Sequence, residues 1–327
     1  MFKQSTCLVI LFFLILLQGK AVAQVKYDLS ALFLKQEITV AISDSGLGGL
    51  SVMDDIARKI KESGCFRKVN LIFVNALFDI NSGYNSLQTK KEKTDMLNKV
   101  LTAIEENYQP DAILIACNTL SVIYTETDFI KISDIPVIGI VEAGVEMISN
   151  KLEDDPASRV IIFGTETTIE ENSHKKALLN LDFSDDRVFT KACPQLQSYI
   201  EQNPAAEETE MLISFYMTEA LEEVGDTAGS VYVSLNCSHF GYSEELWTKA
   251  IENSNYKSGG ILNPNYLMGN VLTDEKYQNR FPDTNISFLV VSKTALINAV
   301  SMSEYFRKTS PELAEALKNY SLIPGLF

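Results

Sequence analysis

Two apolar runs in this chain each end at a cysteine that small polar residues follow. In residues 112–124, AILIACNTLSVIY, the apolar stretch ends at Cys117. In residues 231–240, VYVSLNCSHF, the apolar stretch ends at Cys237, and Ser-His follows. This pattern is typical of a buried strand that delivers a side chain to the start of a helix. The recurrence predicts one site that is built from two similar halves.

Each cysteine is expected at the beginning of a helix. Free backbone N–H groups and the positive end of the helix dipole stabilise a thiolate relative to a thiol. We therefore predict that Cys117 is reactive and that Cys237 belongs to the same site.

The order of apolar runs predicts an α/β fold. Helix-like patterns at residues 50–61, 205–224 and within 84–108 alternate with short apolar runs. This alternation implies mainly parallel sheets that helices cover on both faces, with functional groups at the carboxyl ends of the strands. An irregular crossover is expected at residues 253–270, which are rich in Asn, Gly, Tyr and Pro. Strands are expected at residues 38–42, 69–74, 112–116, 136–141, 159–164 and 231–236, and a short strand is expected to begin at Val188. The last strand is expected at residues 287–291.

The composition excludes some classes of partner. A chain of 327 residues with 46% hydrophobic and 22% charged residues is typical of a globular protein of two domains, at roughly 150 residues each. The formal net charge of −15 repels nucleic acid and anionic membranes, so neither is an expected partner. A small acidic substrate is not excluded, because a few local donors outweigh a distant field that salt screens.

The first residues have the pattern of an export signal. Lys3 is followed by ten apolar residues at 8–17, and Ala21-Val22-Ala23 has the form of a cleavage site. Ten residues are too few to span a bilayer as a helix. We expect residues 1–23 to be a cleaved signal peptide and the mature protein to be periplasmic or secreted, without a membrane segment. An uncleaved membrane anchor is the alternative.

Export bears on the cysteines, because disulfides form in oxidising compartments. Removal of Cys7 with the signal leaves an even number of cysteines, so a disulfide between Cys117 and Cys237 is an alternative to two free thiols. A large domain with a full core does not need such a link, and both thiols follow strand-like runs where loops carry chemistry. Cys65 and Cys193 are expected to be small buried hydrophobic residues.

Six short motifs follow one another across residues 38–242. They are DSGLGGLSV at residues 44–52, ACNT at 116–119, IGIVEAG at 138–144, Thr165-x-x-Thr168-Ile169, ACP at 192–194 and CSH at 237–239. In this order the motifs resemble those of the glutamate racemase family of the aspartate/glutamate racemase superfamily. Each motif is short, but the ordered set is specific.

The resemblance implies racemisation of an acidic amino acid, with glutamate first, and without a cofactor. Racemisation removes the α-proton from one face of the substrate and returns a proton to the other, so one group cannot serve both faces. A thiolate on one side acts as base while a thiol on the other acts as acid. The family's roles imply that Cys117 and Cys237 are these groups, with Asp44 as the partner of Cys117 and His239 as the partner of Cys237.

Other positions that match the family's motifs are expected to complete the site. Glu201 stands at about the distance of a family glutamate near the second cysteine and is assigned a catalytic role, with a solvated helix charge as the alternative. The expected substrate-binding residues are Ser45, Asn118, Thr119, Ser238, Thr168 and Tyr84. With two histidines in the chain and no clustered ligands, no metal site is expected.

The chain departs from the family pattern at the rim of the site. The family's Gly-Asp-Thr-Ala is replaced by residues 74–77, VNAL, so that Asn75 stands in place of a carboxylate. The family's Pro-Tyr-Gly is absent, and Tyr84 lies in the nearest candidate segment. His174 stands where the family usually has tyrosine and is expected to be an exposed helix residue. A solvated face is expected for Lys90, Lys91 and Lys93.

Two pseudo-symmetric doubly wound lobes are expected, with the amino-acid substrate in the cleft between them. Residues 38–137 with 262–327 should form the lobe of Asp44 and Cys117, and residues 138–261 the lobe of Cys237 and His239. The family often dimerises, which leaves a homodimer open, although the sequence shows no partner surface. The alternatives are an exported amino-acid-binding protein and an inactive racemase-like protein. A decarboxylase of the same superfamily is a further alternative. It needs only one of the two thiols, so the presence of both Cys117 and Cys237 counts against it.

Overall fold

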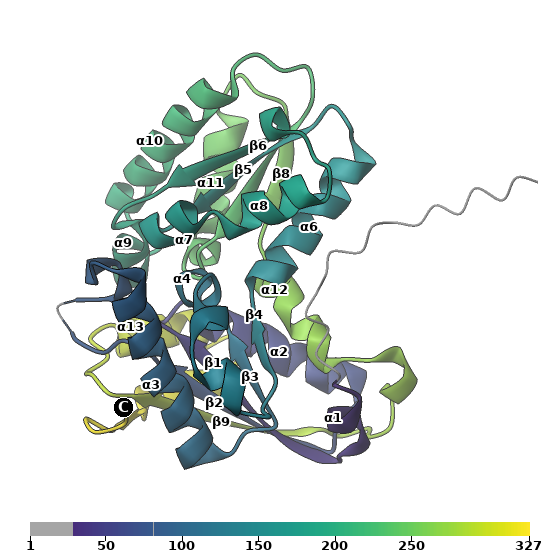
Figure 1. Cartoon of the computed structure of the whole chain (residues 1–327), viewed down its shortest axis with the longest axis vertical. Helices are drawn as coiled ribbons and strands as arrows, with labels where there is room; N and C mark the ends of the chain where they lie inside the picture. Colours follow the sequence, from purple (N-terminus) through teal and green to yellow (C-terminus); the bar gives the residue numbers. More distant parts are fainter. Residues whose placement is uncertain (1–28, 81) are drawn as a thin grey trace, which may run out of the picture.

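Two parallel sheets, each with helices on both faces, form the two lobes of the molecule (Figure 1). This computed structural model describes residues 29–80 and 82–327. The expected signal peptide lies outside the described residues. Within the described part of the chain, no helix is long and apolar enough to cross a membrane.

The first sheet has six strands in the order β10-β9-β2-β1-β3-β4, and every adjacent pair is parallel. Its strands are β1 (Glu37–Asp44), β2 (Lys68–Asn75), β3 (Ala112–Ile115), β4 (Val137–Gly139), β9 (Asn285–Ser292) and β10 (Ser321–Leu322). The register places Asp44 opposite Asn75, and Asn75 opposite Ser292. The carboxyl ends of three strands therefore carry polar side chains at one edge of the sheet.

The second sheet has four strands in the order β6-β5-β7-β8, and its pairs are also parallel. Its strands are β5 (Arg159–Gly164), β6 (Val188–Ala192), β7 (Val231–Asn236) and β8 (Ser258–Leu262). Gly164 lies opposite Asn236 at the carboxyl ends of β5 and β7, directly before Thr165 and Cys237. The α/β fold with mainly parallel sheets is confirmed.

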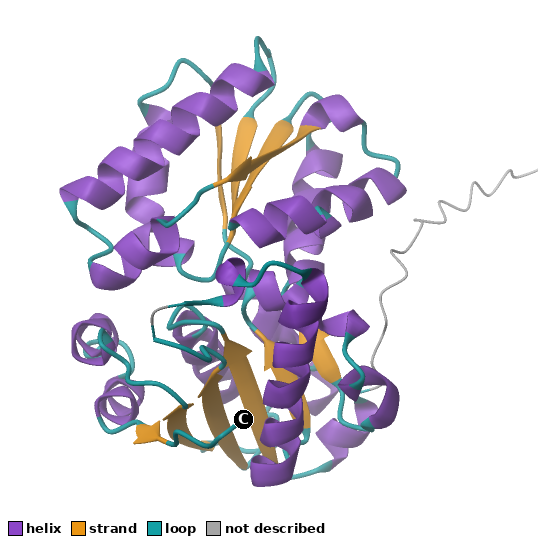
Figure 2. Ribbon diagram, turned by 60° about the vertical axis from the view of Figure 1, so that its left-hand side comes forward, coloured by secondary structure: helices purple, strands orange, loops and turns teal. Residues whose placement is uncertain are grey.

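Helices flank both sheets, as Figure 2 shows. In the first lobe, Val40 and Ile42 of β1 share a core with α2, while Ala41 on the other face packs with α3. Successive strand residues thus point to opposite, equally buried faces. The helices are α1 (Ser30–Leu34), α2 (Leu50–Ser63), α3 (Lys90–Tyr108), α4 (Asn118–Ser121), α5 (Phe129–Ile132), α6 (Val141–Asp154), α7 (Glu166–Glu171), α8 (Ser173–Asn180), α9 (Leu196–Gln202), α10 (Glu207–Val224), α11 (Glu244–Glu252), α12 (Asn265–Met268), α13 (Ala299–Phe306) and α14 (Pro311–Lys318).

Local sequence signals explain where the long helices begin and end. Helix α2 ends at Gly64, whose φ of 58° is the left-handed conformation that glycine adopts without strain. Helix α3 begins with a capping box, in which the Thr89 side chain accepts from the backbone of Glu92 and the Glu92 carboxylate accepts from the backbone of Thr89.

The expectation of an irregular crossover at residues 253–270 is wrong. This segment contains strand β8 and the short helix α12. In β8 only Leu262 is buried, Gly260 has a φ of 102°, and the register with β7 shifts near Tyr232. An edge strand with two glycines has no apolar run or alternation that a sequence pattern could register.

Two other expected strands differ from the structure. Strand β9 is not the last, because the two-residue strand β10 follows it. The expected strand at 136–141 is shorter, since β4 ends at Gly139 and α6 begins at Val141.

Two strands lie near the expected domain bounds. Strand β4 belongs to the first sheet, and β8, which ends at Leu262, belongs to the second. The proposed domain bounds stay a prediction.

Candidate active site

A cavity of about 370 Å³ opens between the carboxyl ends of the two sheets. Both lobes contribute to its wall. All the predicted site residues except Thr168 line it: Asp44, Ser45, Tyr84, Cys117, Asn118, Thr119, Glu201, Cys237, Ser238 and His239. Thr168 is buried behind the wall, where its Oγ1 lies 3.0 Å from Oγ1 of Thr165, which does line the cavity.

Cys117 follows β3 and occupies the N-cap position of the short helix α4. Its Sγ lies 3.2 Å from Oγ of Ser45. Burial and then the negative charge of Asp44 raise the pKa of Cys117 to about 12. The expectation that the helix start favours a thiolate is therefore wrong for Cys117, because burial outweighs a helix of four residues. Cys117 is a neutral thiol that can donate a proton.

Asp44 lies at the end of β1 and connects the two lobes. One carboxylate oxygen accepts from the backbone N–H of Gly46 at 3.0 Å. The other accepts from the Ser238 hydroxyl, which belongs to the second lobe, at 2.7 Å. Burial raises the pKa of Asp44, while the charge of His239 and the hydrogen bond from Ser238 oppose the rise.

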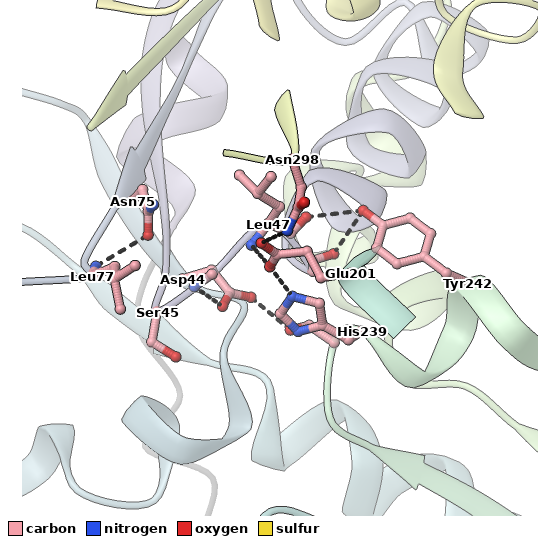
Figure 3. Close-up of polar contacts among 12 residues, drawn as sticks. Asp44, Ser45, Leu47, Asn75, Leu77, Glu201, His239, Tyr242 and Asn298 are labelled. Atoms are coloured by element: carbon pink, nitrogen blue, oxygen red, sulfur yellow. Dashed lines mark hydrogen bonds and ion pairs between the residues drawn. The ribbon is translucent and has the colours of Figure 1, made fainter. Parts of the chain in front are cut away.

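His239 and Glu201 form a hydrogen-bonded pair in the wall of the cavity (Figure 3). Nδ1 of His239 lies 4.0 Å from Sγ of Cys237, and Nε2 lies 2.7 Å from Oε2 of Glu201. Burial lowers the pKa of His239, but its hydrogen bonds to Cys237 and Glu201 outweigh burial, so the pKa is well above its usual value. The pKa of Glu201 is lowered, because hydrogen bonding and the charge of His239 outweigh burial. Each member of the pair therefore stabilises the charged form of the other.

The placement of Glu201 excludes the alternative of a solvated helix charge. It lines the cavity, and its side chain is 22% exposed. Its Oε2 also accepts from the backbone N–H of Leu47 at 3.1 Å, and Nδ2 of Asn298 donates to its Oε1 at 3.2 Å. Leu47 and Asn298 belong to the first lobe, so Glu201 bridges the lobes.

Both thiols of the site are free. Among the described residues the cysteines at 65, 117, 193 and 237 form no disulfide, and all four are buried.

The side-chain amide of Asn118 is buried in the wall with neither its oxygen nor its nitrogen hydrogen bonded within the described protein. Because an unpaired buried amide is costly, this arrangement favours a polar ligand beside Cys117.

A close approach between the lobes explains one glycine of the first motif. A Cβ on Gly48 would lie 2.3 Å from Oγ of Ser238 and 2.6 Å from the backbone nitrogen of His239. Any larger residue would push the lobes apart and separate Asp44 from Ser238. The motif's glycine is therefore required by packing between the lobes.

Several cavity residues were not predicted from the sequence. Among them are Thr165, Gln197, Gln202 and the segment of residues 295–298. Thr165 belongs to a motif of the ordered set and caps α7, but it was not expected in the site. Residues 295–298 lie after the last predicted strand, in a stretch without a motif. The departure at Asn75 is part of the wall, and its Oδ1 accepts from the backbone of Leu77 (Figure 3).

Two surface expectations are wrong. His174 is 2% exposed, and burial lowers its pKa to about 4. Lys93 is also buried, and its Nζ donates to Oγ1 of Thr167 at 2.8 Å across the lobes. Thr167 in turn donates to Oδ1 of Asn85 on the cavity wall at 2.7 Å. Lys91 is exposed, as expected.

The described residues contain no group of three or more His, Cys, Asp or Glu side chains that could hold a metal ion. The polar groups of the cavity are instead two thiols, two carboxylates, one imidazole, and neutral hydroxyls and amides. Such a set can move protons and can hold an amino acid by hydrogen bonds.

Comparison with known proteins agrees with this chemistry. A sequence model of the Asp/Glu/Hydantoin racemase family matches residues 46–246. A glutamate racemase from Sulfurihydrogenibium sp. is 30% identical over 205 residues, which are 62% of this chain and 70% of that protein. A glutamate racemase from Hydrogenobaculum sp. is 29% identical over 63% of this chain and 72% of its own length.

Solved structures share the fold. A glutamate racemase isoform from Bacillus anthracis superposes with a TM-score of 0.64 at 18% identity, covering 84% of this chain and 95% of that chain. A glutamate racemase from Francisella tularensis in complex with D-glutamate superposes with a TM-score of 0.60 at 18% identity, covering 88% and 95%.

The fold, the cavity and these relatives define an amino-acid racemase. The chain belongs to the Asp/Glu/Hydantoin racemase family and, within that superfamily, to the glutamate racemase family.

Proposed function

We propose that this racemase interconverts the enantiomers of a free acidic amino acid, glutamate first, by proton transfer between Cys117 and Cys237. The observation that carries the proposal is that two free thiols from different lobes line one cavity. A substrate between them presents opposite faces of its Cα to the two sulfur atoms. One thiolate removes the α-proton while the opposite thiol donates one, which general acid–base catalysis requires.

The two halves of the site are suited to opposite starting roles. Burial and Asp44 keep Cys117 protonated, so Cys117 is the acid for one enantiomer. Nδ1 of His239 lies 4.0 Å from Sγ of Cys237 and can exchange a proton with it, so we assign Cys237 as the base in the same direction. For the other enantiomer the roles are exchanged, with Asp44 as the acceptor of the Cys117 proton and His239 as the donor to Cys237.

Neutral donors support an amino-acid substrate. Among the described residues no Lys or Arg lines the cavity. The unpaired Asn118 amide is available to bind a carboxylate. The hydroxyls of Ser45 and Thr119 also line the cavity, where they contact Cys117 and Thr165. Glutamate is favoured because the relatives are named glutamate racemases and a structural neighbour binds D-glutamate.

Proton exchange in deuterated water tests the proposal. The purified chain, with residues 1–23 removed, is incubated separately with L- and D-glutamate. Loss of the α-proton is followed by NMR and inversion by circular dichroism. We expect both enantiomers to exchange and invert, with glutamate fastest in a panel that includes aspartate, glutamine and alanine. A panel in which no amino acid exchanges its α-proton would contradict the proposal, and faster turnover of another member would reassign the substrate.

We also propose that the enzyme acts outside the cytoplasm. The support is the order Lys3, apolar residues 8–17 and Ala21-Val22-Ala23. Expression of the full chain in a bacterium should give a periplasmic protein whose mature N-terminus, measured by mass spectrometry, is Gln24. An intact N-terminus in the cytoplasmic fraction would contradict export.

A further inference from the structure

The segment of residues 295–298 brings the C-terminal part of the chain into the active site. It follows β9 and ends at Asn298, directly before α13, and its four residues line the cavity. The segment lies outside residues 46–246, the part that the racemase family matches. Its role in this site therefore does not follow from the family match.

The backbone of Asn298 is fixed by the beginning of α13. Its carbonyl accepts from the backbone N–H of Met302 at 2.9 Å and from the Ser301 hydroxyl at 3.0 Å. With its backbone anchored, the side chain reaches across to the second lobe, and its Nδ2 donates to Oε1 of Glu201 (Figure 3). A donor held in this way restricts the rotamers of the carboxylate that it contacts.

The two oxygens of Glu201 have different partners. Oε2 lies 2.7 Å from Nε2 of His239 and accepts from the backbone of Leu47 at 3.1 Å. Within the described part of the chain, Oε1 has a hydrogen bond from Asn298 alone. Removal of the Asn298 amide thus frees one end of the carboxylate while the other end still faces the imidazole.

We propose that Asn298 is a positioning residue for racemisation: its amide holds Glu201 in the rotamer that bonds His239, and so keeps the imidazole beside the Cys237 thiol. The inference rests on the proposed two-thiol function. Asn298 acts through Glu201 and has no role as acid or base.

Charge supports this geometry. The amide N–H of Asn298 stabilises the ionised form of Glu201 and lowers its pKa. The ionised carboxylate in turn favours the imidazolium form of His239 and raises its pKa. The other charged or titratable groups that act on His239 are Cys237 and Asp44. Loss of the Asn298 amide should therefore lower the pKa of His239.

The test is Asn298→Leu, which keeps the branched shape of the side chain but removes the donor, with the smaller Asn298→Ala as a second variant. We expect kcat to fall about 10-fold or more with KM within about 2-fold, because a mispositioned catalytic group slows the chemical step more than it weakens binding. The matched control is Ser301→Ala, which removes a hydrogen bond to the backbone of the same residue and leaves the amide in place. This control should keep wild-type kcat.

NMR titration of the histidine rings is the second readout. The chain has two histidines, and the buried His174, with a pKa of about 4, serves as an internal reference. We expect the pKa of His239 to fall in both Asn298 variants and that of His174 to stay unchanged. A folded variant with an unchanged His239 titration, or with unchanged kcat, would overturn the proposal. If the wild-type chain racemises no amino acid, the proposed function fails, and the titration still decides whether Asn298 controls the Glu201–His239 pair.

Discussion

Cys117→Ser and Cys237→Ser should each lower kcat/KM for glutamate racemisation by about 10³-fold, since a positioned acid or base contributes roughly 10²–10⁴-fold. A serine hydroxyl is close in size to the thiol but is a far weaker acid, so the fold is kept while one face of the substrate loses its proton carrier. Circular dichroism of D- and L-glutamate solutions measures the loss.

The same variants should separate exchange from inversion. In Cys117→Ser, Cys237 can still remove an α-proton and return a deuteron to the same face. We therefore expect residual exchange without inversion for one enantiomer in this variant, and for the other enantiomer in Cys237→Ser. Exchange of the same enantiomer in both variants would contradict an arrangement with one thiol on each face.

A third buried cysteine provides the control. Cys65 does not line the cavity, and its thiol faces the backbone oxygen of Asp274 at 3.7 Å. Cys65→Ser should keep wild-type racemisation. Full activity in either active-site variant would show that the corresponding thiol has no part in proton transfer.

The fold was predictable where local sequence and burial agree. Strands β1, β2, β5 and β7 are covered on both faces of a parallel sheet. Each therefore appears in the sequence as a mostly continuous apolar run, which a sequence pattern can detect. Strand β8 was missed because backbone pairing at an edge, rather than side-chain burial, defines it. The residues of β7 that pair with β8 lie 25 or more positions earlier in the chain, so this pairing leaves no local signal in the sequence of β8.

The site was predictable where motifs stand at strand ends. Cys117 and Cys237 follow β3 and β7, and the parallel sheets bring these ends to one cavity. Asn298, Lys93 and His174 were missed or misplaced for a shared reason. A polar residue on or next to a helix is expected in solvent unless another part of the chain covers it, and here the covering comes from the opposite lobe or a distant helix.

Asp44→Asn should weaken catalysis and make Cys117 a stronger acid. The amide oxygen can still accept from Gly46 and the amide nitrogen can donate to the Ser238 hydroxyl, so the change removes the charge and keeps both contacts. We expect kcat to fall about 10²-fold, because Cys117 loses the group that accepts its proton. The charge of Asp44 is one cause of the Cys117 pKa of about 12, so this pKa should fall in the variant.

Alkylation of Cys117 by iodoacetamide, followed by mass spectrometry of its peptide, measures that shift. In the wild-type protein alkylation should stay slow until the pH approaches 12, because burial holds the thiol protonated. In Asp44→Asn the rate should begin to rise at lower pH. A variant with an unchanged pH dependence would show that the carboxylate does not act on this thiol.

Asp44→Asn should raise the folding stability of the protein although it lowers kcat. Burial raises the pKa of Asp44 above 3.8, so the folded state binds a proton more tightly than the unfolded chain. The stability that this proton provides is present at low pH and is lost as the pH rises through the folded-state pKa. Asparagine does not ionise, so the variant does not lose stability in this way as the pH rises. Thermal melting should therefore show Asp44→Asn gaining stability over the wild-type protein as the pH rises above about 4, whereas a gap that is constant with pH would mean that the carboxylate titrates alike in both states.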